Sequence, residues 1–183
     1  MVRDKTIVVA VSGGIAAYKS AVLVRELSGA GAEVLVIMTD NACRFITPLT
    51  LETLSRNPVA VDQFSSGNRW DMEHIALADR ADLVVVAPAT ANVIGKAAAG
   101  IADDLVSTAI LTMLTKTPIL MAPAMNTLMW NNPIVRKNVE ILTETGVRFV
   151  GPESGRLADG RTGVGRMSKV EDIVEAASAL LKT

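Results

Sequence analysis

The sequence predicts a single-domain α/β fold in which a doubly wound parallel sheet is sandwiched between helices. Three observations lead to this prediction. Short apolar runs rich in β-branched residues alternate with segments of helical periodicity. The strand-like runs are apolar at nearly every position, as expected when both faces of a sheet are covered. The 183 residues, half of them apolar, also suffice for one domain with a substantial core.

The expected elements alternate regularly along the chain. Strands are predicted at 6–11, 33–38, 82–87, 118–121 and 147–150. Helices are predicted at 15–27, around 48–55, and at 91–99, 105–114, 133–145 and 170–181. Right-handed crossovers then give a Rossmann-like or flavodoxin-like sandwich, with every junction from strand to helix at one edge of the sheet. The polar, glycine-rich stretch 151–167 before the last helix is expected to be a mobile flap, since long loops usually serve a function.

The first of these junctions reads Val11-Ser12-Gly13-Gly14-Ile15. Two glycines let the backbone approach a phosphate closely, and the start of a helix offers unpaired N–H groups and the positive end of its dipole. However, the junction lacks the G-x-G-x-x-G spacing of dinucleotide-binding folds. An anion site and a plain tight turn therefore remain equal alternatives.

Two further junctions carry polar residues that could contact a ligand. Thr39-Asp40-Asn41 could hydrogen-bond a ribityl chain or a phosphate, although capping of the next helix is the simpler role. In Pro88-Ala89-Thr90-Ala91-Asn92, the small residues would let a flat ring lie against the backbone while Thr90 and Asn92 bond its edge. A helix cap is the alternative there, and both roles can hold together.

The segment 122–130 reads Ala-Pro-Ala-Met-Asn-Thr-Leu-Met-Trp and follows the apolar strand at 118–121. Asn126 is therefore expected at the carboxyl end of a parallel strand, where open α/β sheets bind their ligands. Methionine and tryptophan near a strand end usually pack a core, and asparagine commonly caps a helix. Taken alone, the segment favours packing and capping; a ligand-binding role depends on complementary residues elsewhere.

Composition argues against several functional classes. With 18 basic and 19 acidic residues and no basic cluster interleaved with aromatics, the chain is expected to bind neither nucleic acid nor membrane surfaces. Cys43 and His74 are the only residues of their types, so no disulfide and no metal are expected. Neither a membrane span nor a signal-peptide pattern is seen, and a cytoplasmic protein is the expectation. His74 is the only imidazole for proton transfer at neutral pH, although lone histidines are more often structural.

Several segments together resemble the homo-oligomeric flavin-containing cysteine decarboxylases, in order and over nearly the whole chain. They are Ser12-Gly13-Gly14-Ile15-Ala16, His74-Ile75-Ala76-Leu77, Ala81-Asp82, Pro88-Ala89-Thr90-Ala91-Asn92, 122–130, Gly155-Arg156-Leu157-Ala158 and Gly163-Val164-Gly165-Arg166-Met167. The resemblance is greatest to the members that convert 4'-phospho-N-pantothenoylcysteine to 4'-phosphopantetheine in coenzyme A biosynthesis. It implies an FMN cofactor and a small phosphorylated, cysteine-containing substrate that loses carbon dioxide.

The resemblance also implies roles for individual residues. Contacts to the FMN phosphate and its polar surroundings would come from Gly13, Gly14, Ile15, Thr39, Asp40 and Asn41. Contacts to the flavin would come from Thr90, Ala91, Asn92, Val93 and Ala124. Asn126 would bind the substrate carboxylate, and His74 would be the acid/base residue while the flavin oxidises the cysteine thiol. Further substrate contacts would come from Met129, Leu157 and Ala158.

One departure from the family concerns the last step of the reaction. Oxidation of the substrate thiol to a thioaldehyde provides an electron sink for decarboxylation, and the same flavin then reduces the enethiolate product. In the best-studied members of the family the flap carries Ala-Cys-Gly, whose cysteine donates the final proton, whereas this chain reads Ala158-Asp159-Gly160. We hypothesise that Asp159, or water, replaces that donor. Cys43 is not a substitute, because it lies on a predicted helix in the second βα region.

Alternatives of substrate, class and assembly stay open. Peptidyl-cysteine decarboxylases stop at the enethiol, and the absent flap cysteine fits them, while the segment 163–172 favours the coenzyme A enzymes. A non-catalytic FMN-binding regulatory subunit is the third candidate, against which His74 and Asn126 argue. The family implies a homo-oligomer, with FMN between the subunits of a trimer, and trimers can assemble into a dodecamer. Some members continue into a phosphopantothenate-cysteine ligase domain, and the sequence does not decide whether this chain belongs to such a fusion.

Overall fold

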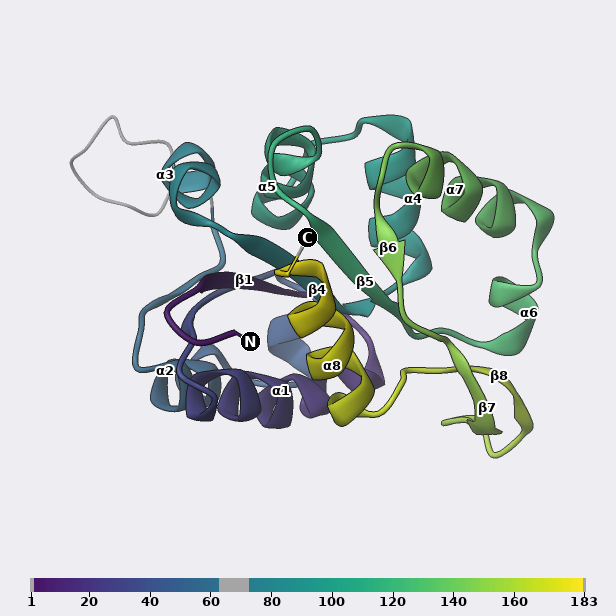
Figure 1. Cartoon of the computed structure of the whole chain (residues 1–183). Helices are drawn as coiled ribbons and strands as arrows, with labels where there is room; N and C mark the ends of the chain where they lie inside the picture. Colours follow the sequence, from purple (N-terminus) through teal and green to yellow (C-terminus); the bar gives the residue numbers. More distant parts are fainter. Residues whose placement is uncertain (1, 63–72, 183) are drawn as a thin grey trace.

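A six-stranded parallel sheet forms the centre of the computed structural model, which describes residues 2–62 and 73–182, without the side chains of residues 73–76 (Figure 1). The strand order is β3-β2-β1-β4-β5-β6. The strands β2 and β3 therefore lie on one side of β1, and β4, β5 and β6 lie on the other. The strands are β1 Thr6–Val11, β2 Glu33–Met38, β3 Val59–Ala60, β4 Leu83–Ala89, β5 Ile119–Pro123 and β6 Arg148–Phe149. This is the predicted doubly wound arrangement.

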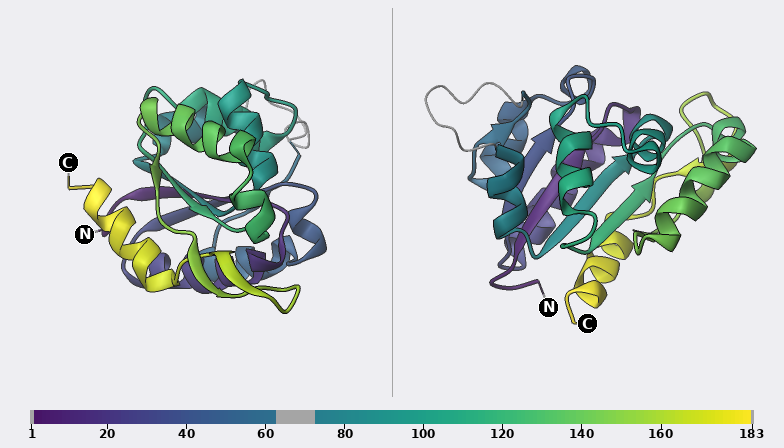
Figure 2. Two further views of the ribbon diagram at one scale, coloured as in Figure 1. Left: turned by 90° about the vertical axis from the view of Figure 1, so that its right-hand side faces the viewer. Right: turned by 90° about the horizontal axis from the view of Figure 1, so that it is seen from above.

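Helices cover both faces of the sheet (Figure 2). On one face lie α1 Tyr18–Gly29, α2 Pro48–Ser55 and α8 Val170–Leu180. On the other lie α3 Glu73–Arg80, α4 Ala91–Ala99, α5 Leu105–Met113 and α7 Pro133–Glu144. Three short helical segments complete the set: η1 Ile15–Ala17, η2 Ala42–Arg44 and α6 Thr127–Trp130.

Burial on both sides explains the continuous apolar strands. Side chains alternate across a strand, so Val9 of β1 packs into one core cluster and Val8 into the other. Leu23 on α1 and Ile110 on α5 are fully buried against these two faces. Such packing of helices on both faces is the usual condition for an all-parallel sheet.

The carboxyl end of β4 departs from regular pairing. The strand was expected to end at residue 87 and instead runs to Ala89, with a register shift against β5 between Val86 and Ala89. Pro88 lies within this shift and has no N–H to donate to the ladder. The irregular end of β4 lies at the sheet edge where the site residues gather.

Residues 151–167, expected to be a flap without regular structure, contain an antiparallel hairpin of β7 Glu153–Arg156 and β8 Thr162–Arg166. Its glycines and charged residues give no apolar alternation, so the sequence pattern did not predict strands there. The elements β3, α3 and α6 were not predicted either; β3 and α6 span only two and four residues. In the described ranges, no helix has both the length and the apolar character needed to cross a bilayer.

Candidate active site

A cleft of about 1060 Å³ lies at the carboxyl edge of the parallel sheet. Its walls come from the segments that follow β1, β2, β4 and β5, and from the β7–β8 hairpin. All the site residues predicted from the sequence line it except His74, namely Gly13, Gly14, Ile15, Thr39, Asp40, Asn41, Thr90, Ala91, Asn92, Val93, Ala124, Asn126, Met129, Leu157, Ala158 and Asp159. His74 belongs to α3, but its side chain lies outside the described residues.

The glycine turn after β1 is packed tightly against the turn after β2. A Cβ atom on Gly13 would overlap the side chain of Asn41, so only glycine fits there. Among the described residues, no hydrogen bond from the backbone N–H of Gly13 or Gly14 is found. These N–H groups precede η1, which runs directly into α1, and they lie on the cleft wall. The turn therefore offers free donors to an anion.

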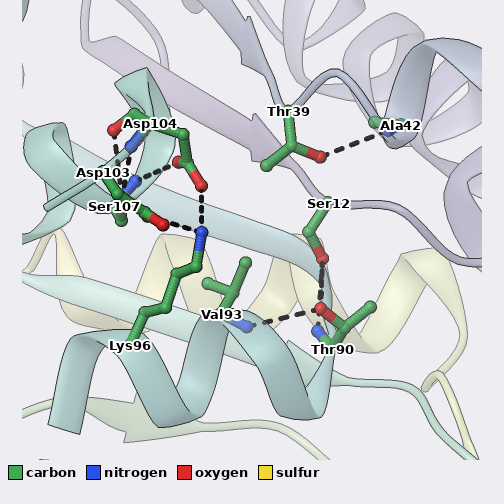
Figure 3. Close-up of polar contacts among 9 residues, drawn as sticks. All are labelled: Ser12, Thr39, Ala42, Thr90, Val93, Lys96, Asp103, Asp104 and Ser107. Atoms are coloured by element: carbon green, nitrogen blue, oxygen red, sulfur yellow. Dashed lines mark hydrogen bonds and ion pairs between the residues drawn. The ribbon is translucent and has the colours of Figure 1, made fainter. Parts of the chain in front are cut away.

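A buried serine joins the ends of β1 and β4 (Figure 3). The Ser12 hydroxyl donates to the Pro88 carbonyl at 2.7 Å and to Thr90 Oγ1 at 3.1 Å, the two acceptors competing for its single proton. Its oxygen accepts from the Thr90 backbone N–H at 3.2 Å. Thr90 Oγ1 in turn caps α4 by accepting from the N–H of Val93 at 3.5 Å. The predicted cap is thus present, and it positions the first turn of α4 on the cleft.

The helix cap expected from residues 39–41 is not formed, because η2 has Asn41 and α2 has Thr47 at the N-cap position, both without a side-chain cap bond. Thr39 instead hydrogen-bonds the turn that leads into η2. Its buried hydroxyl accepts from the backbone N–H of Ala42 at 3.2 Å, at the start of η2 (Figure 3). Cys43 follows in η2 and does not line the cleft. Burial raises the pKa of the Cys43 thiol, with a further contribution from the charge of Asp40. A thiol held in its neutral form is a poor nucleophile, in agreement with a packing role.

Asn126 caps a helix and contacts the flap at the same time. Its Oδ1 accepts from the N–H of Leu128 at 2.8 Å, which places Asn126 at the amino end of α6. Its Nδ2 donates to Asp159 Oδ2 at 2.7 Å. The capping interpretation is confirmed, and the remaining polar face of the amide points to the hairpin across the cleft.

Two lysines that sequence reasoning missed also line the cleft. Lys19 of α1 donates from Nζ to the Met167 carbonyl at 3.0 Å. Burial and then the nearby charge of Arg166 lower the pKa of Lys19. Its place in the second turn after the double glycine was the available signal. That position alone does not distinguish a lysine that lines a cleft from one that faces solvent.

Lys96 of α4 belongs to a charged cluster on the cleft wall (Figure 3). Its Nζ lies 2.5 Å from Asp103 Oδ1 and 2.6 Å from Asp104 Oδ2. Burial opposes the charged form, but the hydrogen bonds and charges of the two carboxylates together raise the pKa of Lys96. Asp104 and Ser107 form a capping box on α5, with Asp104 as the N-cap residue.

Comparisons with known proteins identify the family. The flavoprotein family matches residues 1–182. The coenzyme A biosynthesis bifunctional protein CoaBC of Bacillus subtilis is 48% identical over 97% of this chain, which spans 43% of that protein. A probable phosphopantothenoylcysteine decarboxylase of Streptococcus mutans is 42% identical over 93% of this chain and 96% of its own length.

Solved structures agree with this result. A PPC decarboxylase mutant complexed with pantothenoylaminoethenethiol superposes with a TM-score of 0.88 at 33% identity, over 99% of this chain and 100% of that one. The FMN binding protein AtHal3 has a TM-score of 0.85 at 33% identity, covering 98% of both chains. The chain spans less than half of the bifunctional relatives but nearly all of these shorter proteins. This chain therefore belongs to the flavoprotein family that contains the phosphopantothenoylcysteine decarboxylases.

Proposed function

We propose that this chain is an FMN-dependent carboxy-lyase that converts 4'-phospho-N-pantothenoylcysteine to 4'-phosphopantetheine. The observation that carries the proposal is the convergence of the Gly13-Gly14 turn, the first turn of α4 and Asn126 on one cleft. Similarity to a CoaBC protein, to a phosphopantothenoylcysteine decarboxylase and to an FMN binding protein supports it. The reaction would supply coenzyme A biosynthesis.

The residues of the cleft fit FMN. The free N–H groups of Gly13 and Gly14 provide donors for the phosphate, and the tight packing against Asn41 leaves the backbone itself as the contact surface. Thr39 lies on the adjacent turn, and the small residues Ala91 and Ala124 leave room for a flat ring. When bound, FMN would accept a hydride from the substrate and later return it.

The substrate carboxylate would bind the amide of Asn126. Because Asn126 Oδ1 already accepts from Leu128, its Nδ2 is presented as the donor. A neutral donor suits this task, since a carboxylate held by a full positive charge would be stabilised against loss of carbon dioxide. Met129, Leu157 and Ala158 line the same cleft and would contact the rest of the substrate.

Two titratable residues would handle protons. His74 would be the acid/base residue as the substrate thiol is oxidised. Asp159, which lies on the hairpin and reaches Asn126, would donate the last proton in place of a flap cysteine. We infer that the substrate binds between α6 and the hairpin.

The test is carbon dioxide release by the purified protein loaded with FMN. Asn126→Ala should retain the flavin absorption spectrum and lose turnover by about a hundredfold or more, as for loss of a group that orients the reacting substrate. Asn132→Ala is the matched control, because Asn132 caps α7 in the same way, accepting from Ile134 at 2.9 Å, but does not line the cleft. Protein that binds FMN and releases no carbon dioxide would support the regulatory-subunit alternative instead.

The presence of Asp159 in place of a flap cysteine favours a second candidate function, that of a peptidyl-cysteine decarboxylase that stops at the enethiol. The flap cysteine donates the proton of the final reduction in the enzymes that complete it. Its absence therefore fits an enzyme that stops at the enethiol. Mass spectrometry separates the two candidates, because the proposed product is two hydrogens heavier than the enethiol. Turnover of a peptide ending in cysteine, with none of the phosphopantothenoyl substrate, would favour the second.

We also propose that the chain assembles into a homotrimer or into a dodecamer built from four such trimers. Leu128, Met129 and Ile134 are apolar side chains on α6 and α7 that are largely exposed, close in sequence to Asn126. Contiguous exposed apolar side chains often mark protein interfaces. Light scattering after size exclusion should give three or twelve times the 19.3 kDa of the chain. A monomer with full activity would contradict this assembly.

A further inference from the structure

We infer that Asp159 is an internal competitor for the carboxylate position on Asn126, an inference that rests on the proposed function. In the absence of substrate, the Asp159 carboxylate already accepts a hydrogen bond from Asn126 Nδ2 at 2.7 Å. This is the bond proposed for the substrate carboxylate. The flap residue and the substrate thus present the same chemical group to the same donor.

The Asp159 carboxylate is held in place from both sides. Its Oδ1 accepts from the backbone N–H of Arg161 at 3.0 Å, while its Oδ2 takes the bond from Asn126. A turn between Leu157 and Arg161 supports this geometry, with Leu157 N–H donating to the Arg161 carbonyl at 2.8 Å. The tip of the hairpin, residues 157–161, therefore carries a preformed anionic ligand for Asn126.

The base of the hairpin is attached much more firmly than its tip. The Met125 N–H donates to the Gly165 carbonyl at 2.9 Å. A Cβ on Gly163 would overlap Thr127, and one on Gly165 would overlap the Met125 carbonyl, so β8 lies directly against this segment. Within the part of the chain that the structure describes, one side chain, that of Asn126, bonds the tip across the cleft. Release of that bond would free the tip while the base stays attached.

Asp159 and a substrate carboxylate exclude one another on Asn126. The amide oxygen is occupied by Leu128, so both carboxylates need the same nitrogen. Two carboxylates bound to one nitrogen would lie within about 5 Å of each other and repel strongly in a partly enclosed cleft. Although Nδ2 has two N–H donors, this repulsion favours one carboxylate at a time, so substrate binding would displace the tip.

The competition gives an order to the reaction. While the substrate carboxylate occupies Asn126, Asp159 is kept off that donor. Loss of carbon dioxide removes the competing anion, and Asp159 can return to Asn126, next to the decarboxylated intermediate that needs a proton. The returning carboxylate carries no proton of its own, so it would take one up from water and pass it to the intermediate after decarboxylation.

The experiment compares two ligands on the FMN-loaded protein by calorimetry. One is 4'-phospho-N-pantothenoylserine, which keeps the carboxylate but has a hydroxyl in place of the oxidisable thiol. The other is 4'-phosphopantetheine, which has no carboxylate. If the tip occupies Asn126 about nine-tenths of the time, Asp159→Ala should bind the serine ligand about tenfold more tightly. Binding of 4'-phosphopantetheine should stay unchanged.

Both ligands carry the same phosphate, so an effect of Asp159 on the phosphate would change both affinities equally. The serine ligand also carries one more negative charge, so the double variant described below is needed to assign its gain to Asn126. Arg161→Ala is the matched control, because Arg161 contributes its backbone N–H to the tip and does not line the cleft. It should leave the ratio of the two affinities unchanged. When Asp159→Ala is added to the Asn126→Ala variant, it should no longer tighten binding of the serine ligand.

Two failures are distinguishable. If the wild-type protein releases carbon dioxide and binds both ligands, but Asp159→Ala leaves their affinity ratio unchanged, the competitor inference is wrong and the proposed function stands. If the wild-type protein neither binds the serine ligand nor releases carbon dioxide, the proposed function fails and the inference fails with it.

Discussion

Ser12 and Thr90 are 78 residues apart in the sequence and hydrogen-bond each other through both hydroxyl and backbone groups, at 3.1 and 3.2 Å. Ser12 directly follows β1, and Thr90 is the N-cap residue of α4, the helix after β4. These two segments flank the point where the strand order reverses, which is where open α/β sheets form their ligand clefts. The pair therefore sets the spacing between the glycine turn and the first turn of α4.

Ser12→Ala should weaken both the fold and FMN binding. The Pro88 carbonyl and the Thr90 N–H would lose their buried partner, which costs about 1–3 kcal/mol in the free energy of unfolding. The start of α4 would also lose its positioning contact, so we expect the Kd for FMN to rise about tenfold, as 1.4 kcal/mol would give. Urea unfolding and FMN titration measure the two effects.

Ser20→Ala is the control for that substitution. Ser20 is equally buried and donates to the Ala87 carbonyl at 2.7 Å, but it does not line the cleft. It should lose comparable stability and keep the wild-type affinity for FMN. Equal losses of FMN affinity in both variants would show that the Ser12 effect is only general destabilisation.

Gly13→Ala should abolish tight FMN binding, because the added methyl group overlaps the Asn41 side chain and forces the two turns apart. We expect the Kd for FMN to rise by a factor of about ten or more. Gly29→Ala is the control: no atom lies within 4 Å of its added Cβ, and alanine favours the end of α1. That variant should gain up to about 1 kcal/mol in stability and bind FMN normally.

Most of the cleft was predictable because strand ends converge in a parallel sheet. The turn at Gly13 and the segments at Thr90 and Asn126 each follow an apolar strand, so the sequence places them at one edge before any contact is known. Their capping roles were predictable for the same reason. Local patterns carry this information, since a strand, a turn and a helix start are neighbours in the chain.

The unpredicted parts depend on contacts between distant segments. Lys19 reaches the Met167 carbonyl, 148 residues away, and nothing near Lys19 in the sequence indicates that partner. The hairpin packs through glycine backbone, with Gly165 against Met125, and so has no side-chain pattern to detect. Asn126 and Asp159 were each predicted as site residues, but the sequence did not indicate the hydrogen bond between them.

Acid should destabilise the protein partly through Glu153. The hydrogen bond from Arg166 at 2.8 Å, followed by that from the Lys169 N–H, lowers the pKa of Glu153 in the folded state. The unfolded chain then binds more protons than the folded chain at acidic pH, so stability rises with pH. The contribution of Glu153 is present above its ordinary carboxyl pKa, and it is lost as pH falls through that value toward the folded one.

Urea unfolding between pH 7 and pH 3 measures this dependence. Glu153→Gln should lower stability at pH 7 and show a shallower loss on acidification than the wild type. Glu175→Gln, on an exposed position of α8, should keep the wild-type slope. Asp82 has its pKa lowered by the Thr6 N–H and by Lys5, so part of the acid dependence should persist in Glu153→Gln. An unchanged slope in Glu153→Gln would refute its contribution.

Gly165→Ala should detach the hairpin and stop catalysis while leaving the sheet intact. Its φ is +154°, and an added Cβ would overlap the Met125 carbonyl, to whose residue it is hydrogen-bonded. Gly100→Ala is the matched control, since Gly100 has φ +70° and nothing within 4 Å of an added Cβ. Both variants carry backbone strain of about 1 kcal/mol, but only Gly165→Ala adds a collision at the cleft. Hydrogen exchange should therefore rise across residues 153–166 in Gly165→Ala alone, with loss of carbon dioxide release. If hydrogen exchange in that hairpin stays at the wild-type rate, the contact with Met125 does not fix the hairpin in place. The segment 125–127 would then shift to accommodate the added methyl group.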